Sequence, residues 1–362
     1  MAHPAVRKGS PDVSLSREEF FRRYRDKFYD PAFDSESTAI DRLAKIAWDA
    51  YRDGRKAPRT RKAGEGYADP GYDLSTEWIE AAAAIDAARK RHMHADGPTR
   101  LLVISGSPRS DQTCPGEMSK SWRLLHIARE ALGDKDENGA SIEVKVLDLS
   151  HLASEYGRTI HPCKGCFSTS PALCHFPCSC YPNHSLGQTG DWMNEIYPMW
   201  IEAHGVMIVT PVHWDQSPSA LKLMIDRLVC ADGGNEDPTT THGKDPERAR
   251  AMEPDWRYPR HLAGRAYSLV VHGDSEGIDG LRHALTDWLE AMELVAAEPK
   301  GVISRYVGYM APYGESHDAL DADKGLQEEV RNAARSLVRT VSSIRSGQLP
   351  VADKGIVDPR PK

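Results

Sequence analysis

The sequence lacks the features that mark membrane-spanning, secreted and nucleic-acid-binding proteins. No apolar run approaches the roughly 18 residues that a membrane-spanning helix needs. The first residues carry no apolar segment followed by a small-residue cleavage site, so we expect a cytoplasmic protein without a membrane span. The net charge of -7 provides no general surface for nucleic acid, and we expect no nucleic-acid partner.

Cysteines are few and unevenly placed. There are seven, an odd number, and five of them lie between residues 163 and 180. This distribution does not fit a disulfide framework spread over the fold. In a reducing compartment it favours thiols or metal ligands.

Two nucleotide-binding signatures are also missing. The sequence has neither a Walker loop nor the glycine-rich dinucleotide fingerprint. It has an apolar strand pattern over 100–105 that runs into Gly106-Ser-Pro-Arg109, followed by a helical pattern over 116–132. A helix that starts after a small-residue loop is a common phosphate site, so this segment favours a mononucleotide.

From residue 100 onwards, apolar strand patterns alternate with amphipathic helices. Strands are predicted at 101–105, 142–147, 206–210, 266–272 and 302–307, and helices at 116–132, 190–203, 218–229, 278–292 and 325–345. This alternation predicts an α/β fold with a doubly wound, five-stranded parallel sheet in the order 2-1-3-4-5. In that order the loops after the first and third strands lie side by side, where such sheets bind ligands.

The rest of the chain is predicted to extend this domain. Residues 1–97 show helical spacing and are expected to form an all-helical extension without catalytic groups, in which the basic stretch 55–62 is a linker. The sheet domain is expected at 98–346, with a Cys-rich insert at 161–184, a loop insertion at 231–264 and a C-terminal tail at 347–362.

A second motif follows the third predicted strand. It reads Thr210-Pro-Val-His-Trp214, and Leu221-Lys-x-x-x-Asp-Arg227 comes soon after. Together with Gly106-Ser-Pro-Arg109, this motif resembles the NAD(P)H-dependent FMN reductase family of the flavodoxin-like fold over about residues 100–340. The resemblance implies FMN as cofactor, NADH or NADPH as electron donor and a quinone-like or other small molecule as acceptor. It also implies a homodimer or homotetramer.

The resemblance assigns residues to the site. Ser107, Arg109 and Thr113 correspond to phosphate-loop positions, Pro211, Val212, His213 and Trp214 to the segment beside the flavin ring, and Gly273 to a third flavin-side loop. Because the first loop is long, Ser119 and Lys120 are further phosphate candidates. Asp111 departs from the family pattern, and we expect its carboxylate to point away. No catalytic residue is assigned, because hydride transfer is the chemistry of the cofactor.

The cluster from Cys163 to Cys180 leaves three interpretations open. They are buried or redox thiols, an iron-sulfur cluster and a zinc site, since thiolates suit both metals. Its spacing matches only the first cysteine pair of related iron-sulfur flavoproteins, so no metal is assigned. The alternative to a reductase is accordingly a flavodoxin-type or iron-sulfur flavoprotein electron carrier. The long extension and the Trp214 loop argue against a bare carrier.

Overall fold

The computed structural model describes residues 14–111 and 118–348, which divide into two compact units. The sheet unit contains residues 83–160, 192–232 and the described chain from 259 onwards. The second unit contains the described chain up to 82, together with 161–191 and 233–258. No helix among the described residues is long and apolar enough to cross a membrane. The domain limits at 97 and 346 stay predictions.

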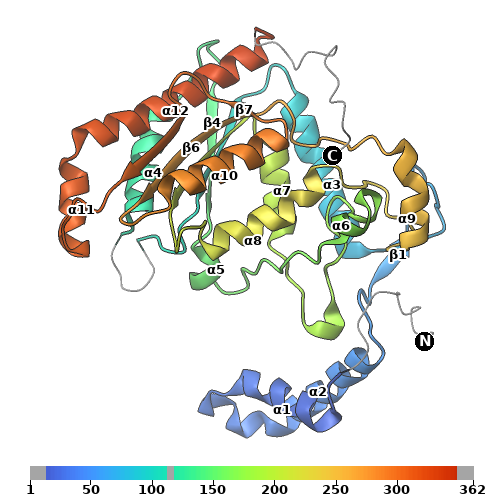
Figure 1. The fold of residues 1–362 in the computed structure, drawn as a ribbon. Coiled ribbons are helices and arrows are strands. Elements are labelled where there is room, and N and C mark those ends of the chain that lie inside the picture. Colours follow the sequence, from blue (N-terminus) through green and yellow to red (C-terminus); the bar gives the residue numbers. More distant parts are fainter. Residues whose placement is uncertain (1–13, 112–117, 349–362) are drawn as a thin grey trace. The chain divides into compact units, whose positions relative to one another are not determined.

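The sheet unit is built on a parallel sheet (Figure 1). Its path runs β4 (Ile142–Asp148), β3 (Thr99–Ser105), β5 (Gly205–Pro211) and β6 (Ala266–Gly273), as the sequence predicted. The position beyond β6 is shared by two strands. The first residues of β6 pair with β7 (Val295–Ala296), and the later ones pair with β8 (Val302–Tyr306). Among the described residues the sheet has six strands rather than the predicted five, and β7 is the additional strand.

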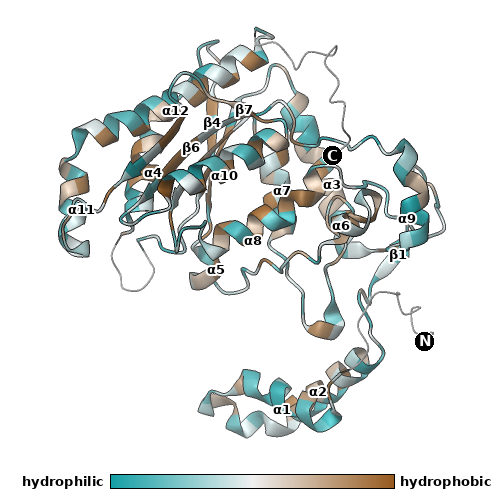
Figure 2. Cartoon of the chain, in the orientation of Figure 1, coloured by the Kyte–Doolittle hydropathy of each residue, from teal (hydrophilic) through white to brown (hydrophobic). Residues whose placement is uncertain are grey.

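Burial along the strands explains why their patterns were readable. Strands β3, β5 and β6 are buried along almost their whole length, as expected for parallel strands covered on both faces. The edge strand β4 instead alternates half-buried and exposed residues over its first five positions. Figure 2 shows the strands as the most apolar part of the sheet unit, while the helices that cover them also carry polar residues.

Helices cover both faces of the sheet. Alternate strand residues such as Val103 and Met207 share a core with α4 (Lys120–Leu132) and α12 (Lys324–Arg345). On the other face lie α7 (Met193–Glu202), α8 (Ser219–Leu228) and α10 (Ile278–Ala291) (Figure 1). These five helices agree with the predicted ranges within a few residues. Two short helices, α5 (His151–Ser154) and α11 (Tyr313–Ala322), were not predicted.

The second unit begins with the predicted N-terminal helices. These are α1 (Arg17–Arg25), α2 (Ser37–Arg52) and the start of α3 (Thr76–Met93). The extension is not all-helical as predicted, because β1 (Thr60–Lys62) pairs with β2 (Asp73–Ser75) in a small antiparallel ladder. The stretch 55–62 is therefore more than a linker, since its last three residues form β1.

The two predicted inserts pack against each other in this second unit. Short helices α6 (Cys166–Thr169) and α9 (Pro246–Met252) belong to the Cys-rich insert and to the later insertion, respectively. A small core of Ala172, Leu173 and Ala249 joins them. Each insert is too short to bury much apolar surface alone, and their packing supplies a shared core.

Candidate functional site

The candidate site lies at the carboxyl ends of the parallel strands. A cavity of about 180 Å³ opens there, lined by the loops that follow β3, β5, β6 and β8 and by the start of α4 and α11. Its lining residues are Ser107, Arg109, Ser119, Lys120, Ser121, Pro211, Val212, His213, His272, Gly273, Asp274, Val307 and Tyr313. Loops after neighbouring parallel strands converge at this edge, so the location agrees with the predicted switch point.

The loop after β3 is held close to β5. The backbone N–H of Gly106 donates to the carbonyl oxygen of Val209 at 2.8 Å. A Cβ atom on Gly106 would lie 2.6 Å from the hydroxyl oxygen of Thr210, which is fully buried. Only glycine fits this approach without a shift of its neighbours. The close packing fixes the direction in which Ser107 and Arg109 leave the strand.

Two cations gather at one end of the cavity around a single aromatic ring. The Arg109 guanidinium donates to the Tyr313 hydroxyl at 2.9 Å and lies 5.5 Å from the ring centroid. The Lys120 ammonium lies 5.1 Å from the same centroid and donates to the carbonyl oxygen of Val307 at 2.9 Å. A positively charged end of this kind is suited to a phosphate group.

Two serine hydroxyls in the lining make different hydrogen bonds. The Ser107 hydroxyl accepts from the backbone N–H of Arg109 at 3.1 Å, which leaves its own proton for a ligand. The Ser119 hydroxyl caps α4 by accepting from Trp122, and it donates to the carbonyl oxygen of Arg109. Ser119 therefore lines the cavity, but its hydroxyl proton is already donated to the carbonyl oxygen of Arg109.

A buried histidine, His272, is part of the cavity lining. His272, at the end of β6, is bonded through Nε2 to the Ser121 hydroxyl at 2.8 Å and is 4% exposed. Burial lowers its pKa to about 3, with smaller contributions from Lys120 and His213, so the ring is neutral at pH 7. Its Nδ1 atom has no hydrogen-bond partner among the described residues.

Further lining residues belong to the ends of β5 and β6 and to the chain that follows these strands. Pro211, Val212 and His213 continue from β5, and the N–H of Val212 donates to the carbonyl oxygen of His272 at 2.8 Å. Gly273 lies beside them, and a Cβ there would come within 3.1 Å of Ile278. Partial burial lowers the pKa of His213, although Asp274 opposes this shift. The imidazole is therefore neutral near pH 7, where it can line a ring.

Trp214 is a predicted site residue that the structure places elsewhere. Trp214 lies outside the lining and is 97% exposed, at the tip of a two-residue turn closed by bonds between His213 and Gln216. Both central residues, Trp214 and Asp215, have positive φ, at 53° and 62°. Asp111 is exposed and outside the lining, in agreement with the expectation that it points away. Thr113 lies outside the described residues.

Sequence reasoning missed several lining residues. It did not name Ser121, His272, Asp274, Val307 or Tyr313 as site residues. His272 had a usable signal, because it immediately precedes Gly273 at the end of a predicted strand. Tyr313 had none, because α11 shows no clear apolar periodicity.

This set of residues fits a phosphorylated flavin. Two cations and the Ser107 hydroxyl suit the phosphate, and the Pro211–His213 edge with Gly273 suits a flat ring. Among the described residues, no group of three or more His, Cys, Asp or Glu side chains is arranged to hold a metal ion.

The solved structures that match this chain are distant in sequence. RosB, solved with the bound intermediate OHC-RP (8-demethyl-8-formylriboflavin-5'-phosphate), is 13% identical, with a TM-score of 0.46 over 69% of this chain and 82% of RosB. An FMN-dependent NADH-azoreductase from Bacillus anthracis, in complex with FMN, is 16% identical, with a TM-score of 0.38 over 66% of this chain and 100% of its own. An oxidoreductase from Corynebacterium diphtheriae is 15% identical, with a TM-score of 0.38 over 68% of this chain and 98% of its own.

The family assignment comes from a comparison of sequences. No curated protein matches this chain. The family model described as NADPH-dependent FMN reductase matches residues 99–304, more than half of the 362-residue chain, and the match spans the loops that line the cavity from Ser107 to Asp274. The chain belongs to the NADPH-dependent FMN reductase family.

Proposed function

We propose that the chain passes electrons from NADH or NADPH, through FMN bound in the cavity at the carboxyl end of the sheet, to a quinone-like or other small acceptor. The observation that carries this proposal is the lining itself. It combines two cations, the segment Pro211–His213 with Gly273 beside it, and a buried, neutral His272. Bound FMN supplies the hydride chemistry.

The protein residues bind and orient in this proposal. Arg109, Lys120 and the hydroxyl of Ser107 hold the phosphate, and Thr113 remains a proposed phosphate ligand. Pro211, Val212, His213 and Gly273 lie along the ring. Ser119 contributes through its cap of α4, which positions Lys120 and Ser121 at the start of the helix. Trp214 has no role in this proposal, because its side chain is almost fully exposed.

A second copy of the chain is a further part of the proposal. Met310 is 92% exposed and contacts the hydroxyl of Tyr306, itself 44% exposed, through its sulfur at 3.7 Å. Tyr313, which lines the cavity, is also 43% exposed. Apolar side chains exposed beside a site are typical of association surfaces. We propose a homodimer or homotetramer, and sedimentation velocity will measure which one forms.

Anaerobic mixing tests the electron path. We expect the purified protein to be yellow, to bleach with NADH or NADPH and to regain colour when a quinone is added. If donor and acceptor use the same face in turn, steady-state kinetics will be ping-pong. Running both nucleotides in parallel identifies the donor. Bound flavin that bleaches with neither nucleotide but accepts electrons from a reductase protein would instead indicate a carrier. Protein that binds no flavin would refute both functions.

A further inference from the structure

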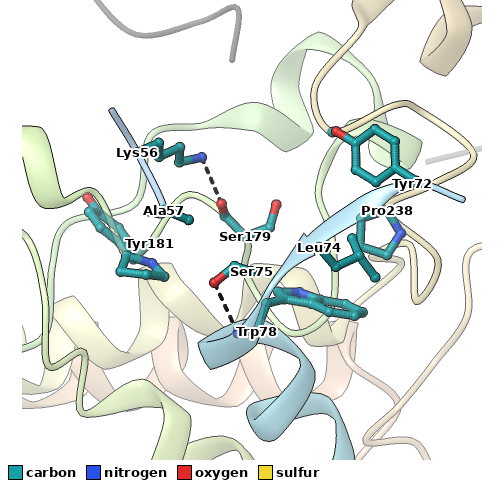
Figure 3. A pocket seen from close by; sticks show the side chains of 11 residues that line it. Lys56, Ala57, Tyr72, Leu74, Ser75, Trp78, Ser179, Tyr181 and Pro238 are labelled. Atoms are coloured by element: carbon teal, nitrogen blue, oxygen red, sulfur yellow. Dashed lines mark hydrogen bonds between the residues drawn. The ribbon is translucent and has the colours of Figure 1, made fainter. Parts of the chain in front are cut away.

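The Cys-rich insert is fixed within the second unit by side chains distant in sequence. The Trp78 indole N–H donates to the carbonyl oxygen of Pro177 at 2.9 Å, and the Lys56 ammonium donates to that of Ser179 at 2.7 Å. Figure 3 shows Lys56 directed at Ser179, beside Ser75 and Trp78. The cavity that these residues line measures about 10 Å³, room for about one water molecule. It therefore belongs to the packing that holds the insert and offers no ligand site.

A second anchor holds the other side of the insert. The backbone of Asn235 accepts from Phe176 at 2.8 Å and donates to Cys174 at 2.7 Å. Between these bonds, the His175 ring is hydrogen-bonded at both nitrogens, to the hydroxyls of Ser179 and Thr241, at 2.6 and 2.7 Å. The chain from 174 to 180 is thus held at several points, so the thiols that it carries have fixed positions.

Two thiols are brought into contact by this arrangement. The Sγ atoms of Cys166 and Cys180 are 3.3 Å apart, across 14 residues of sequence, and both side chains are thiols. Cys180 is 5% exposed, whereas Cys166 is half-buried and packs against the core of Ala172 and Leu173. A disulfide bond is about 2.05 Å long, so the sulfurs need to close by only about 1.2 Å. Of the two, Cys166 is the one that a solvent-borne molecule reaches first.

A lysine supplies positive charge to this pair. The Lys244 ammonium donates to the carbonyl oxygen of Leu173 at 2.6 Å. Burial alone would lower the pKa of Lys244, but Cys180, Cys166, Cys178 and Cys174 together raise it, so the ammonium keeps its charge. The hydrogen bond from Cys180, together with the charge of Lys244, lowers the pKa of Cys166 to about 6 against burial and the charges of Cys178 and Cys174. Cys166 is therefore largely thiolate at pH 7.

The arrangement of the cysteines bears on the question of a metal ion. Among the described residues, none of the cysteine groups is arranged as a metal site. Of the interpretations that the sequence left open, the 3.3 Å contact between the Sγ atoms of Cys166 and Cys180 favours redox thiols.

We propose that Cys166 and Cys180 form a redox-active dithiol that exchanges with small-molecule disulfides, Cys166 being the attacking thiolate and Cys180 the resolving thiol. Cys166 attacks one sulfur of a disulfide such as oxidised glutathione, forms a mixed disulfide and releases one thiolate. Cys180 loses its proton, attacks the Cys166 sulfur and releases the second thiolate. Two thiols of the chain are oxidised and one disulfide is reduced to two thiols. Both released thiolates take up a proton.

Alkylation of the intact, wild-type protein tests the first half of the proposal. Iodoacetamide is applied to the reduced chain over a range of pH, and each cysteine is quantified by peptide mass spectrometry. We expect Cys166 to react with a half-point near pH 6. Lys244→Gln should slow the reaction of Cys166 at pH 6 to 7 by up to roughly tenfold, because the thiolate fraction falls.

Exchange with oxidised glutathione tests the second half. The wild type should lose two hydrogens and yield a Cys166–Cys180 linked peptide, whereas Cys180→Ser should retain one glutathionyl group on Cys166. Cys166→Ser should do neither, and the matched control Cys163→Ser should behave as the wild type. Circular dichroism and thermal unfolding verify that each variant is folded.

Several results would overturn the proposal. One is an alkylation rate of Cys166 that reaches its half-point near pH 8.5, as for an unperturbed thiol. This measurement uses the wild type alone. Another is a disulfide that joins Cys166 to Cys174 or Cys178 in place of Cys180. A third is stoichiometric zinc or iron in the purified protein that protects these thiols until a chelator removes it. None of these measurements involves flavin, so they leave the proposed reductase activity untouched.

Discussion

Replacing Arg109 with alanine removes one of the two cations that line the candidate phosphate end of the cavity. A hydrogen bond to a charged group contributes about 1.5 to 3 kcal/mol, so FMN affinity should fall roughly 10- to 150-fold. The loss should stay in this range because Lys120 still lines the same end. Arg109 lies in a loop outside the apolar core, so the free energy of unfolding should change by less than about 1 kcal/mol.

The assay is a titration of apoprotein with FMN, followed by the quenching of flavin fluorescence. Riboflavin, which lacks the phosphate, is titrated in parallel and should bind the wild type and Arg109→Ala with equal affinity. Arg129→Ala is the matched control, because Arg129 is exposed on α4, the helix that carries Lys120, and lies outside the cavity. Tyr313→Phe removes the hydroxyl bonded to Arg109 while keeping the ring, which separates loss of the cation from loss of its partner. Unchanged FMN affinity, or an equal loss for riboflavin, would refute the phosphate assignment.

Three further predictions concern stability. Gly106→Ala should lower the free energy of unfolding by about 1 to 3 kcal/mol in urea titrations, because its Cβ would overlap Thr210; an unchanged midpoint would contradict this packing. Burial would raise the pKa of Glu202, but bonds from Lys145 and Arg91 lower it, so its stabilisation holds above about pH 4.3 and disappears as the pH falls through the lower folded value. Glu202→Gln should therefore lower the free energy of unfolding by about 1 to 3 kcal/mol at pH 7, and its free energy of unfolding should depend less on pH below about 4.3 than that of the wild type. An equal pH dependence in the variant and the wild type would contradict the role of the ion pairs. His272 titrates near pH 6.5 when unfolded and near 3 when folded, so apoprotein stability should fall by up to about 1.4 kcal/mol per pH unit below 6.5, and the slope should be shallower in a folded His272→Asn variant.

The sheet could be predicted from the sequence because its central strands are buried on both faces. A run such as Leu101–Ser105 has few alternatives to a parallel strand when amphipathic helices flank it. The strand β7 could not be predicted, because two residues carry no pattern and its pairing depends on where β6 begins.

The candidate site was predictable where it follows strand ends and was missed where it depends on distant pairing. Arg109 and His213 come directly after predicted strands, so their positions follow from topology. The bond between Ser121 and His272 joins residues 151 positions apart, and no local pattern reports it. The same is true of Cys166 and Cys180, whose contact depends on bonds made by Lys56 and Asn235 elsewhere in the unit.

The turn at Trp214 and Asp215 has a consequence for protein engineering. Backbones with positive φ at both central positions favour Asn-Gly, whereas a bulky residue in such a conformation costs about 1 kcal/mol or more. This chain keeps a tryptophan there and leaves its indole in solvent. Directed evolution for heat resistance alone should therefore substitute Asn-Gly at these positions early. A screen that also requires turnover would retain Trp214 if activity depends on its indole and would lose it otherwise.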